Sequence, residues 1–297
     1  MKSHQAISCL LGSLCLLSQL PITRVQAELV DWTTQPDSPA LDGLDVAAAN
    51  PIGEIAYNYN APILADRGTP LGRRGAGSRS GSLEDDSNLE NICMSRSGPS
   101  PLIALVPSTQ ESRSSETPGR VSPKNFESVL SLTTQSKPTF WFYLPARPDD
   151  IPLEFVLQIE HENQTDETVY QTQLSGNHSA GIMRLTLPED APTLQLNTRY
   201  RWFFSVGCDS GPVNVSGSID LVSLDPALQL SLAEATPREQ VAIYASNGLW
   251  QDAITLLGEL YRADSDNISR ANDWYSLLES VGLEDIAQQP LIDCCTP

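Results

Sequence analysis

The chain has 297 residues, and its 18 basic and 37 acidic side chains give it a formal net charge of −19. A surface this acidic repels the phosphate backbone of nucleic acids, so the charge excludes nucleic-acid binding as the main activity. Three histidines and six cysteines leave little material for metal centres or for a nucleophile activated by histidine. We therefore expect a protein without cofactors.

Residues 1–27 have the pattern of a secretory signal peptide. Lys2 provides the positive start, residues 6–20 are mostly apolar, and residues 25–27 offer the small-x-small pattern that signal peptidase accepts. The apolar stretch is too short for a transmembrane helix, which needs about 20 apolar residues. We expect an exported protein without a transmembrane span, located in the periplasm, at the cell surface or in the medium.

Removal of this segment leaves four cysteines, and four cysteines in an exported chain are more often bridged than free. Buried thiols are the alternative. Adjacent cysteines rarely pair with each other, so each member of the C-terminal pair is expected to bridge to a separate partner nearer the front of the chain. The candidates are Cys93, Cys208, Cys294 and Cys295.

Residues 28–92 lack a sustained hydrophobic period and are rich in Pro, Gly and Ser, which is typical of extended or disordered chain. A Gly-rich stretch within them has the composition of an anion cradle, although the Gly-Lys-Ser/Thr of a Walker loop is missing. The alternative is a flexible segment that lies against the acidic domain. The candidate anion contacts are Arg67, Arg73, Arg74 and Arg79.

From residue 102 the hydrophobic pattern has the period of two that β-strands show, and we expect a mobile loop over residues 108–137. Seven short strands separated by turn residues predict a β-sandwich of the fibronectin III or immunoglobulin type over residues 93–224. The predicted strands are 102–107, 139–144, 153–160, 167–174, 181–187, 199–208 and 213–222.

The turn before the most aromatic strand supports this interpretation. Leu194, Asn197 and Tyr200 resemble the tyrosine corner of fibronectin type III domains, where a Leu, a turn and a Tyr precede the penultimate strand. Asn tolerates the left-handed conformation that such a turn uses. The simpler alternative is that Tyr200 is one more aromatic side chain of the core.

After Asp225 the period changes to 3.6, which predicts a C-terminal helical region over residues 225–297. Thr236 and Pro237 mark the start of a first helix, which ends at Gly248. A second helix is expected over residues 250–263, and a third from about residue 272 to Gly282.

Residues 244–254 resemble the turn of a tetratricopeptide hairpin, in which a Gly lets two helices pack closely. The apolar stripe of such a hairpin should pack partly on the sandwich. Any apolar residue left exposed is a candidate contact for a protein partner, namely Tyr244, Leu249 and above all Trp250. The alternative is that Trp250 is wholly buried between the helices and the sandwich.

These landmarks resemble the cyanobacterial domain of unknown function 928 family in their order and spacing, from about residue 67 to the end. The long loop over residues 108–137 and Ala76, where the family tends to have Gly, depart from its pattern. The resemblance implies a small exported protein of cyanobacteria and offers no catalytic residues to transfer. The residues that carry it are 67–79, 105–107, 138–145, 169–170, 181–182, 200–202, 244–254, 281–283 and the terminal Cys294–Cys295 pair.

The best candidate for an enzymatic site is a group of acids beside a histidine at one predicted turn. Paired carboxylates serve in acid–base catalysis or calcium binding, but on a solvated turn they are ordinary surface charge. The group comprises Glu160, Glu162, Asp166, Glu167 and His161.

We therefore expect an exported, noncatalytic protein-interaction or structural module with an unidentified protein partner. A carboxylate-site hydrolase and a carbohydrate-binding module are the alternatives. A hydrolase needs convergent polar groups in a concave site, a carbohydrate-binding module needs exposed coplanar aromatic rings, and an interaction module needs an exposed apolar patch.

Overall fold

The computed structural model describes residues 55–62, 72–77, 102–117, 120–146, 151–161, 164–175, 179–207 and 212–293. All of them belong to one compact unit, residues 48–297. The predicted signal segment and the four candidate bridge cysteines lie outside the described residues, as do Arg67 and Arg79.

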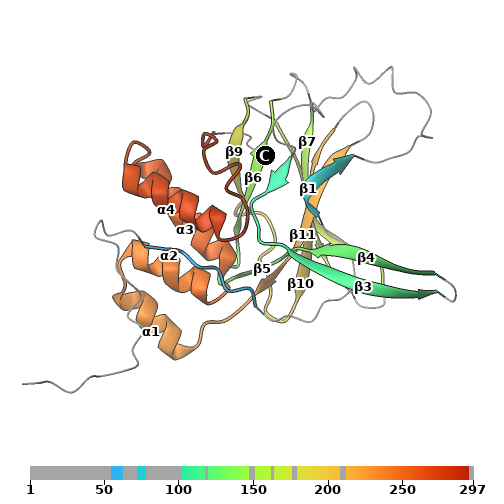
Figure 1. Cartoon of the computed structure of the whole chain (residues 1–297), viewed down its shortest axis with the longest axis horizontal. Helices are drawn as coiled ribbons and strands as arrows, with labels where there is room; N and C mark the ends of the chain where they lie inside the picture. The colour runs from blue at the N-terminus through green and yellow to red at the C-terminus, as the bar shows by residue number, and fades with distance from the viewer. Residues whose placement is uncertain are drawn as a thin grey trace, which may run out of the picture. The chain divides into compact units, whose positions relative to one another are not determined.

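One curled, open sheet of nine strands forms the framework (Figure 1). Eight strands follow each other in the order β8-β7-β10-β11-β1-β2-β6-β9, and each is antiparallel to its neighbours. The ninth, β5, runs parallel to β11. The strands are β1 (Gly72–Gly77), β2 (Ile103–Ala104), β5 (Leu130–Thr133), β6 (Thr139–Leu144), β7 (Leu153–Ile159), β8 (Glu167–Leu174), β9 (Gly181–Thr186), β10 (Arg199–Val206) and β11 (Val213–Leu221).

The concave side of this sheet holds an aromatic core. Strand β10 contributes every second side chain to it, since Tyr200, Trp202, Phe204 and Val206 are all buried. The ring of Phe204 stacks on that of Phe142 with 4.2 Å between the centroids. Period-two patterning thus fixes which face of each strand is apolar.

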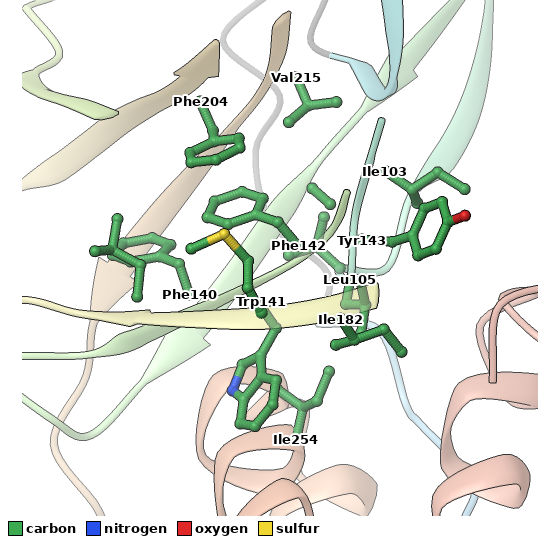
Figure 2. Packing of buried hydrophobic residues seen from close by; sticks show 14 of the residues in the cluster. Ile103, Leu105, Phe140, Trp141, Phe142, Tyr143, Ile182, Phe204, Val215 and Ile254 are labelled. Atoms are coloured by element: carbon green, nitrogen blue, oxygen red, sulfur yellow. The ribbon is translucent and has the colours of Figure 1, made fainter. Parts of the chain in front are cut away.

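Strand β6 is buried on both faces, in contrast to β10. All six of its residues are buried, because one face looks into the aromatic core and the other is covered by helices. Figure 2 shows Phe140 and Phe142 on the side of Phe204, while Trp141 points the opposite way, toward Ile254 of a helix.

Four helices follow the last strand: α1 (Pro226–Glu234), α2 (Pro237–Ser246), α3 (Trp250–Ala263) and α4 (Ile268–Glu279). Three begin at a side chain that accepts a backbone N–H of the first turn, namely Asp225, Thr236 and Asn267. Thr236 forms a full capping box with Glu239. Within the described part of the chain, no helix combines the length and apolarity that a membrane crossing requires.

The predicted β-sandwich is wrong, because the strands form one curled half-barrel sheet. Strand β1 is responsible: it pairs with β11 on one side and with β2 on the other, and so joins two groups of strands that would otherwise be separate. This strand lies in the Gly/Arg stretch that the composition predicted to be extended or flexible chain. Alternation of apolar residues defines faces, but it does not define which strands pair.

The predicted tetratricopeptide-like region is also wrong. A Gly does shape the bend between α2 and α3, but the apolar residues of α3 pack on the sheet instead of forming a repeat. Its buried residues include Trp250, Ile254 and Leu257, and Trp141 of β6 lies directly over Gly258. The result is a group of four short helices that packs on the sheet through α3, and it includes α1, which the period did not predict.

The expected loop over residues 108–137 contains three strands. Strands β3 (Thr109–Thr117) and β4 (Arg120–Ser128) pair as an antiparallel hairpin, which extends away from the main sheet in Figure 1. Strand β5 follows it and pairs with β11. The Ser- and Thr-rich composition of the hairpin concealed its strands, because they lack the apolar alternation of a half-buried sheet.

The local contact expected at the predicted tyrosine corner is present. The hydroxyl of Tyr200 accepts a hydrogen bond from the backbone N–H of Gln195 at 3.1 Å, and Asn197 has a φ of 60°. This turn therefore leads into a central strand of a single curled sheet, without the sandwich that it was taken to support.

Candidate functional site

Residues 55–62, called the strap below, run without regular secondary structure across helices α2, α3 and α4. Figure 1 shows this drawn-out segment in blue beside α2. Its hydrophobic side chains alternate: Tyr57 is buried, Tyr59 is half-buried, and Asn58 between them is exposed. The two tyrosines thus face the helices, while Asn58 faces away from them.

Tyr57 is the most deeply buried residue of the strap, with 2% of its surface exposed. Its backbone N–H donates to Oγ of Ser276 on α4 at 3.3 Å. Its phenol lies near the ion pair in which Arg238 of α2 binds both oxygens of Asp273 of α4, each at 2.6 Å. Burial, followed by the negative charge of Asp273, raises the pKa of Tyr57 to about 12.

Tyr59 and Asn60 attach the strap to the junction between α2 and α3. The ring of Tyr59 meets that of Trp250 edge to face, with 5.2 Å between the centroids. The backbone N–H of Asn60 donates to the carbonyl of Ala245 at 3.1 Å, and its side-chain Nδ2 donates to that of Ser246 at 2.9 Å. The strap therefore supplies additional donors to carbonyls of the last turn of α2, where the continuing helix no longer provides the usual partners.

Gly248 makes the close approach of the strap possible. Its φ is +74°, a conformation that L side chains rarely adopt, and a Cβ there would lie 2.9 Å from the carbonyl oxygen of Asn60 and 3.1 Å from Cδ of Pro62. A side chain at this bend would therefore strain the turn and push the strap away.

The predicted partner contacts lie close to the strap, but they are mostly covered. Trp250 is 0% exposed and its Nε1 donates to the carbonyl of Leu105 at 2.8 Å. Leu249 is buried as well, and Tyr244 is half-buried. Trp250 therefore has no surface for a partner in this conformation, and its burial agrees with the alternative of a side chain packed between helices and sheet.

The contact between the helices and the sheet, called the seam below, is dense and contains buried polar anchors. Nε1 of Trp141 donates to Oγ1 of Thr255 at 3.2 Å. Asp252 accepts from the backbone N–H of Thr134 at 2.9 Å and also from its hydroxyl. Burial raises the pKa of Asp252, while these hydrogen bonds oppose the rise. The seam thus fixes α3 in one register on the sheet.

Arg73 and Arg74, two of the candidate anion contacts, bind groups of the chain itself. The Arg73 guanidinium donates to the carbonyls of Val281 at 2.7 Å and Gly282 at 3.2 Å, which follow the end of α4. Arg74 forms an ion pair with Asp285 at 3.0 Å. These contacts agree with the alternative in which the segment lies against the domain.

The candidate carboxylates are drawn together by an arginine that the sequence reasoning missed. Arg201 of β10 lies 2.9 Å from Asp166 and 3.5 Å from Glu160, and their side chains are 13%, 19% and 9% exposed, respectively. The expected solvated turn is therefore wrong for these two acids. The one signal in the sequence was that Arg201 alternates with the apolar residues of an aromatic strand, which places it on the opposite face from the core.

The remaining members of this group form no catalytic arrangement in the described residues. Nε2 of His161 lies 3.8 Å from a carboxylate oxygen of Glu167 on the exposed turn, and Glu162 lies outside the described residues. The described part of the chain contains no group of three or more His, Cys, Asp or Glu that could hold a metal ion.

Tryptophans do not form a sugar platform in the described part of the chain. Trp141, Trp202, Trp250 and Trp274 are each at most 1% exposed, whereas a carbohydrate-binding face needs exposed rings. The strap and its helices are therefore the best candidate for a functional site.

A comparison with family models finds that residues 74–291 match the model described as Domain of Unknown Function (DUF928). The matched range contains all four helices and every strand of the sheet from Arg74 onward, but the strap lies outside it. A comparison with curated proteins finds no match.

Proposed function

The chain belongs to the DUF928 family, and from this premise we propose that it is an exported, noncatalytic module that binds an extended segment of a protein chain across helices α2, α3 and α4. The strap carries this proposal. It is an extended segment that already occupies these helices through main-chain hydrogen bonds, two tyrosine side chains and one asparagine.

The position of the family match supports the proposal. The helices that hold the strap belong to the matched domain, and the strap precedes it in sequence. A surface of the matched range is therefore occupied by a segment of the same compact unit that precedes the match. Such a contact uses the same chemistry whether the segment belongs to the same chain or to another one.

The contacts of the strap are those of peptide recognition. Tyr57 and Tyr59 give two aromatic anchors, which bury large areas at low conformational cost. The hydrogen bonds of Asn60 fix the register of the segment on α2. Asn58 faces away from the helices, so the recognised pattern is Tyr-x-Tyr-Asn.

Export is the second part of the proposal and rests on residues 1–27. In an oxidising compartment we expect Cys93 and Cys208 each to be bridged to the Cys294–Cys295 pair. N-terminal sequencing of the mature protein should begin after Ala27, and peptide mapping without reductant should recover the two bridges. Four free thiols on native protein would contradict the bridging.

A peptide covering residues 53–64 tests the binding function. We expect it to bind a full-length Tyr57→Ala/Tyr59→Ala variant, whose own strap is weakened, as measured by fluorescence anisotropy of a labelled peptide. The matched control is the same peptide with both tyrosines replaced by alanine. Equal binding of the two peptides, or no binding by either, would contradict the proposal.

A further inference from the structure

We infer that the segment bound in trans is the strap of a second copy of this chain, so that two copies exchange straps. This inference rests on the proposed function, and it adds the identity of the partner. Its support comes from complementarity, from charge and from the length of the connection between the strap and the sheet.

The strap is as complementary to the helices of a second copy as it is to its own. The strap fits the helices with two buried or half-buried tyrosines and with three hydrogen bonds, from Tyr57 and Asn60 to helix atoms. A second copy presents an identical strap to an identical surface. When two copies exchange straps, each strap makes the same contacts that it makes in the monomer with its own helices. Exchange is therefore a low-cost route to a dimer.

Charge favours the strap as the segment that crosses between copies. Two chains with a net charge of −19 repel each other. The strap reads Ile-Ala-Tyr-Asn-Tyr-Asn-Ala-Pro and has no charged side chain, so it brings no like charge to the acceptor helices. Salt screens the remaining repulsion, and exchange should therefore increase with ionic strength.

The connection to the sheet allows the strap to reach another molecule. Ten peptide units separate residue 62 from residue 72, the first of β1, and each spans at most about 3.5 Å, which gives a reach of about 35 Å. Strand β1 is anchored independently by its pairing and by Arg73. Departure of the strap thus leaves the strands of the sheet in place.

A pair of complementary variants tests the exchange. The acceptor is Tyr57→Ala/Tyr59→Ala, which keeps the helices and loses the strap anchors. The donor is Ser276→Arg, which places a long charged side chain where the backbone of Tyr57 binds α4. Co-expressed with different tags, the two full-length chains should form 1:1 heterodimers with twice the molar mass of either alone, as measured by light scattering. Each variant alone should remain a monomer.

Two matched controls separate a blocked surface from a damaged fold. Ser269→Arg introduces the same side chain at an exposed position of α4, and Asn58→Ala changes the exposed residue between the two tyrosines. Both should dimerise as the unaltered chain does, with a larger dimer fraction at higher salt. All variants should retain the far-ultraviolet circular dichroism of the unaltered chain.

The outcomes distinguish this inference from the proposed function. Monomers in the mixture, together with binding of the 53–64 peptide to the acceptor, would overturn the exchange and leave the proposed function standing. Failure of the peptide to bind would overturn both. A dimer formed equally well by the acceptor alone would overturn the exchange, because it would arise from another surface.

Discussion

The seam and the strap are two contacts of the same helices, and they are built differently. At the seam, Trp141, Trp250 and Trp274 are at most 1% exposed, and the polar Asp252 is buried with them. In the strap, four of eight residues are exposed and only Tyr57 is buried. Because the seam is buried between the helices and the sheet, it opens only when the whole molecule unfolds. The strap is partly exposed, so it can detach in a local opening that leaves the helices and the sheet folded.

Removal of the Trp250 side chain should have the largest effect. Trp250→Ala leaves a cavity at the seam and removes the hydrogen bond to Leu105, so we expect a loss of about 3–5 kcal/mol in the free energy of unfolding. Denaturant titration measures it, and Leu230→Ala, at an exposed position of α1, is the control. A nearly unchanged melting temperature with loss of peptide binding would show instead that Trp250 is a binding residue.

High pH should release the strap before it opens the seam. The pKa of Tyr57 is raised to about 12 from its ordinary 10.0, so the neutral phenol stabilises the bound strap. That contribution is complete below pH 10 and is lost as the pH rises toward 12. The ultraviolet absorbance of tyrosinate follows the ionisation, and a Tyr57→Phe variant should lose less stability over this interval. Identical pH profiles for the two chains would contradict this account.

A side chain at Gly248 should weaken the strap and the bend together. Gly248→Ala introduces a Cβ 2.9 Å from the carbonyl oxygen of Asn60 and forces an L residue to a φ of +74°. We expect a loss of about 1–3 kcal/mol, with the strap more sensitive to proteases than in the unaltered chain. Gly282→Ala is the control, because Gly282 also has a positive φ, of +67°, whereas a Cβ there would lie 3.7 Å from the Arg73 guanidinium and would meet no strap atom. Equal protease sensitivity in the two variants would contradict a direct contact with the strap.

The smallest expected effect is the loss of one side-chain hydrogen bond of the strap, which should distinguish Asn60 from Asn58. Asn60→Ala removes the side-chain hydrogen bond to Ser246 and should cost about 1 kcal/mol of strap binding. Asn58→Ala, at an exposed position, should change it little. Affinities of the corresponding variant peptides for the strap-weakened chain measure both effects, and a larger loss for Asn58→Ala would reverse the assigned orientation of the strap.

Single elements of this fold were predictable because each carries its own period. The expected strand 139–144 and helix 250–263 coincide with β6 and α3. A run of apolar and aromatic residues and a stripe of apolar residues with a period of 3.6 are both local signals. The pairing of strands was not local. Strand β1 has Gly and Arg where an apolar alternation would be expected, and it nevertheless joins β11 to β2.

The candidate site was less predictable than the fold, because its parts are far apart in the sequence. Tyr57 and Ser276 are separated by 219 residues, and Arg201 and Asp166 by 35. The alternation of Ile55, Tyr57 and Tyr59 was a usable signal for a bound segment, but polar neighbours and surrounding Pro and Gly obscured it. Trp250 was expected above all others to be an exposed partner contact, but the structure buries it against the sheet, as the alternative interpretation held.

Hydrogen exchange of individual amides tests the difference between strap and seam most directly. The amide of Asn60, bonded to the Ala245 carbonyl, and the amide of Thr134, bonded across the seam to Asp252 of α3, report the two contacts in the same molecule. We predict that the Asn60 amide exchanges through a local opening with a much smaller free energy than the Thr134 amide. Free 53–64 peptide should leave exchange of the Thr134 amide unchanged. Equal opening free energies for the two amides, matching that of global unfolding, would contradict a strap that detaches on its own.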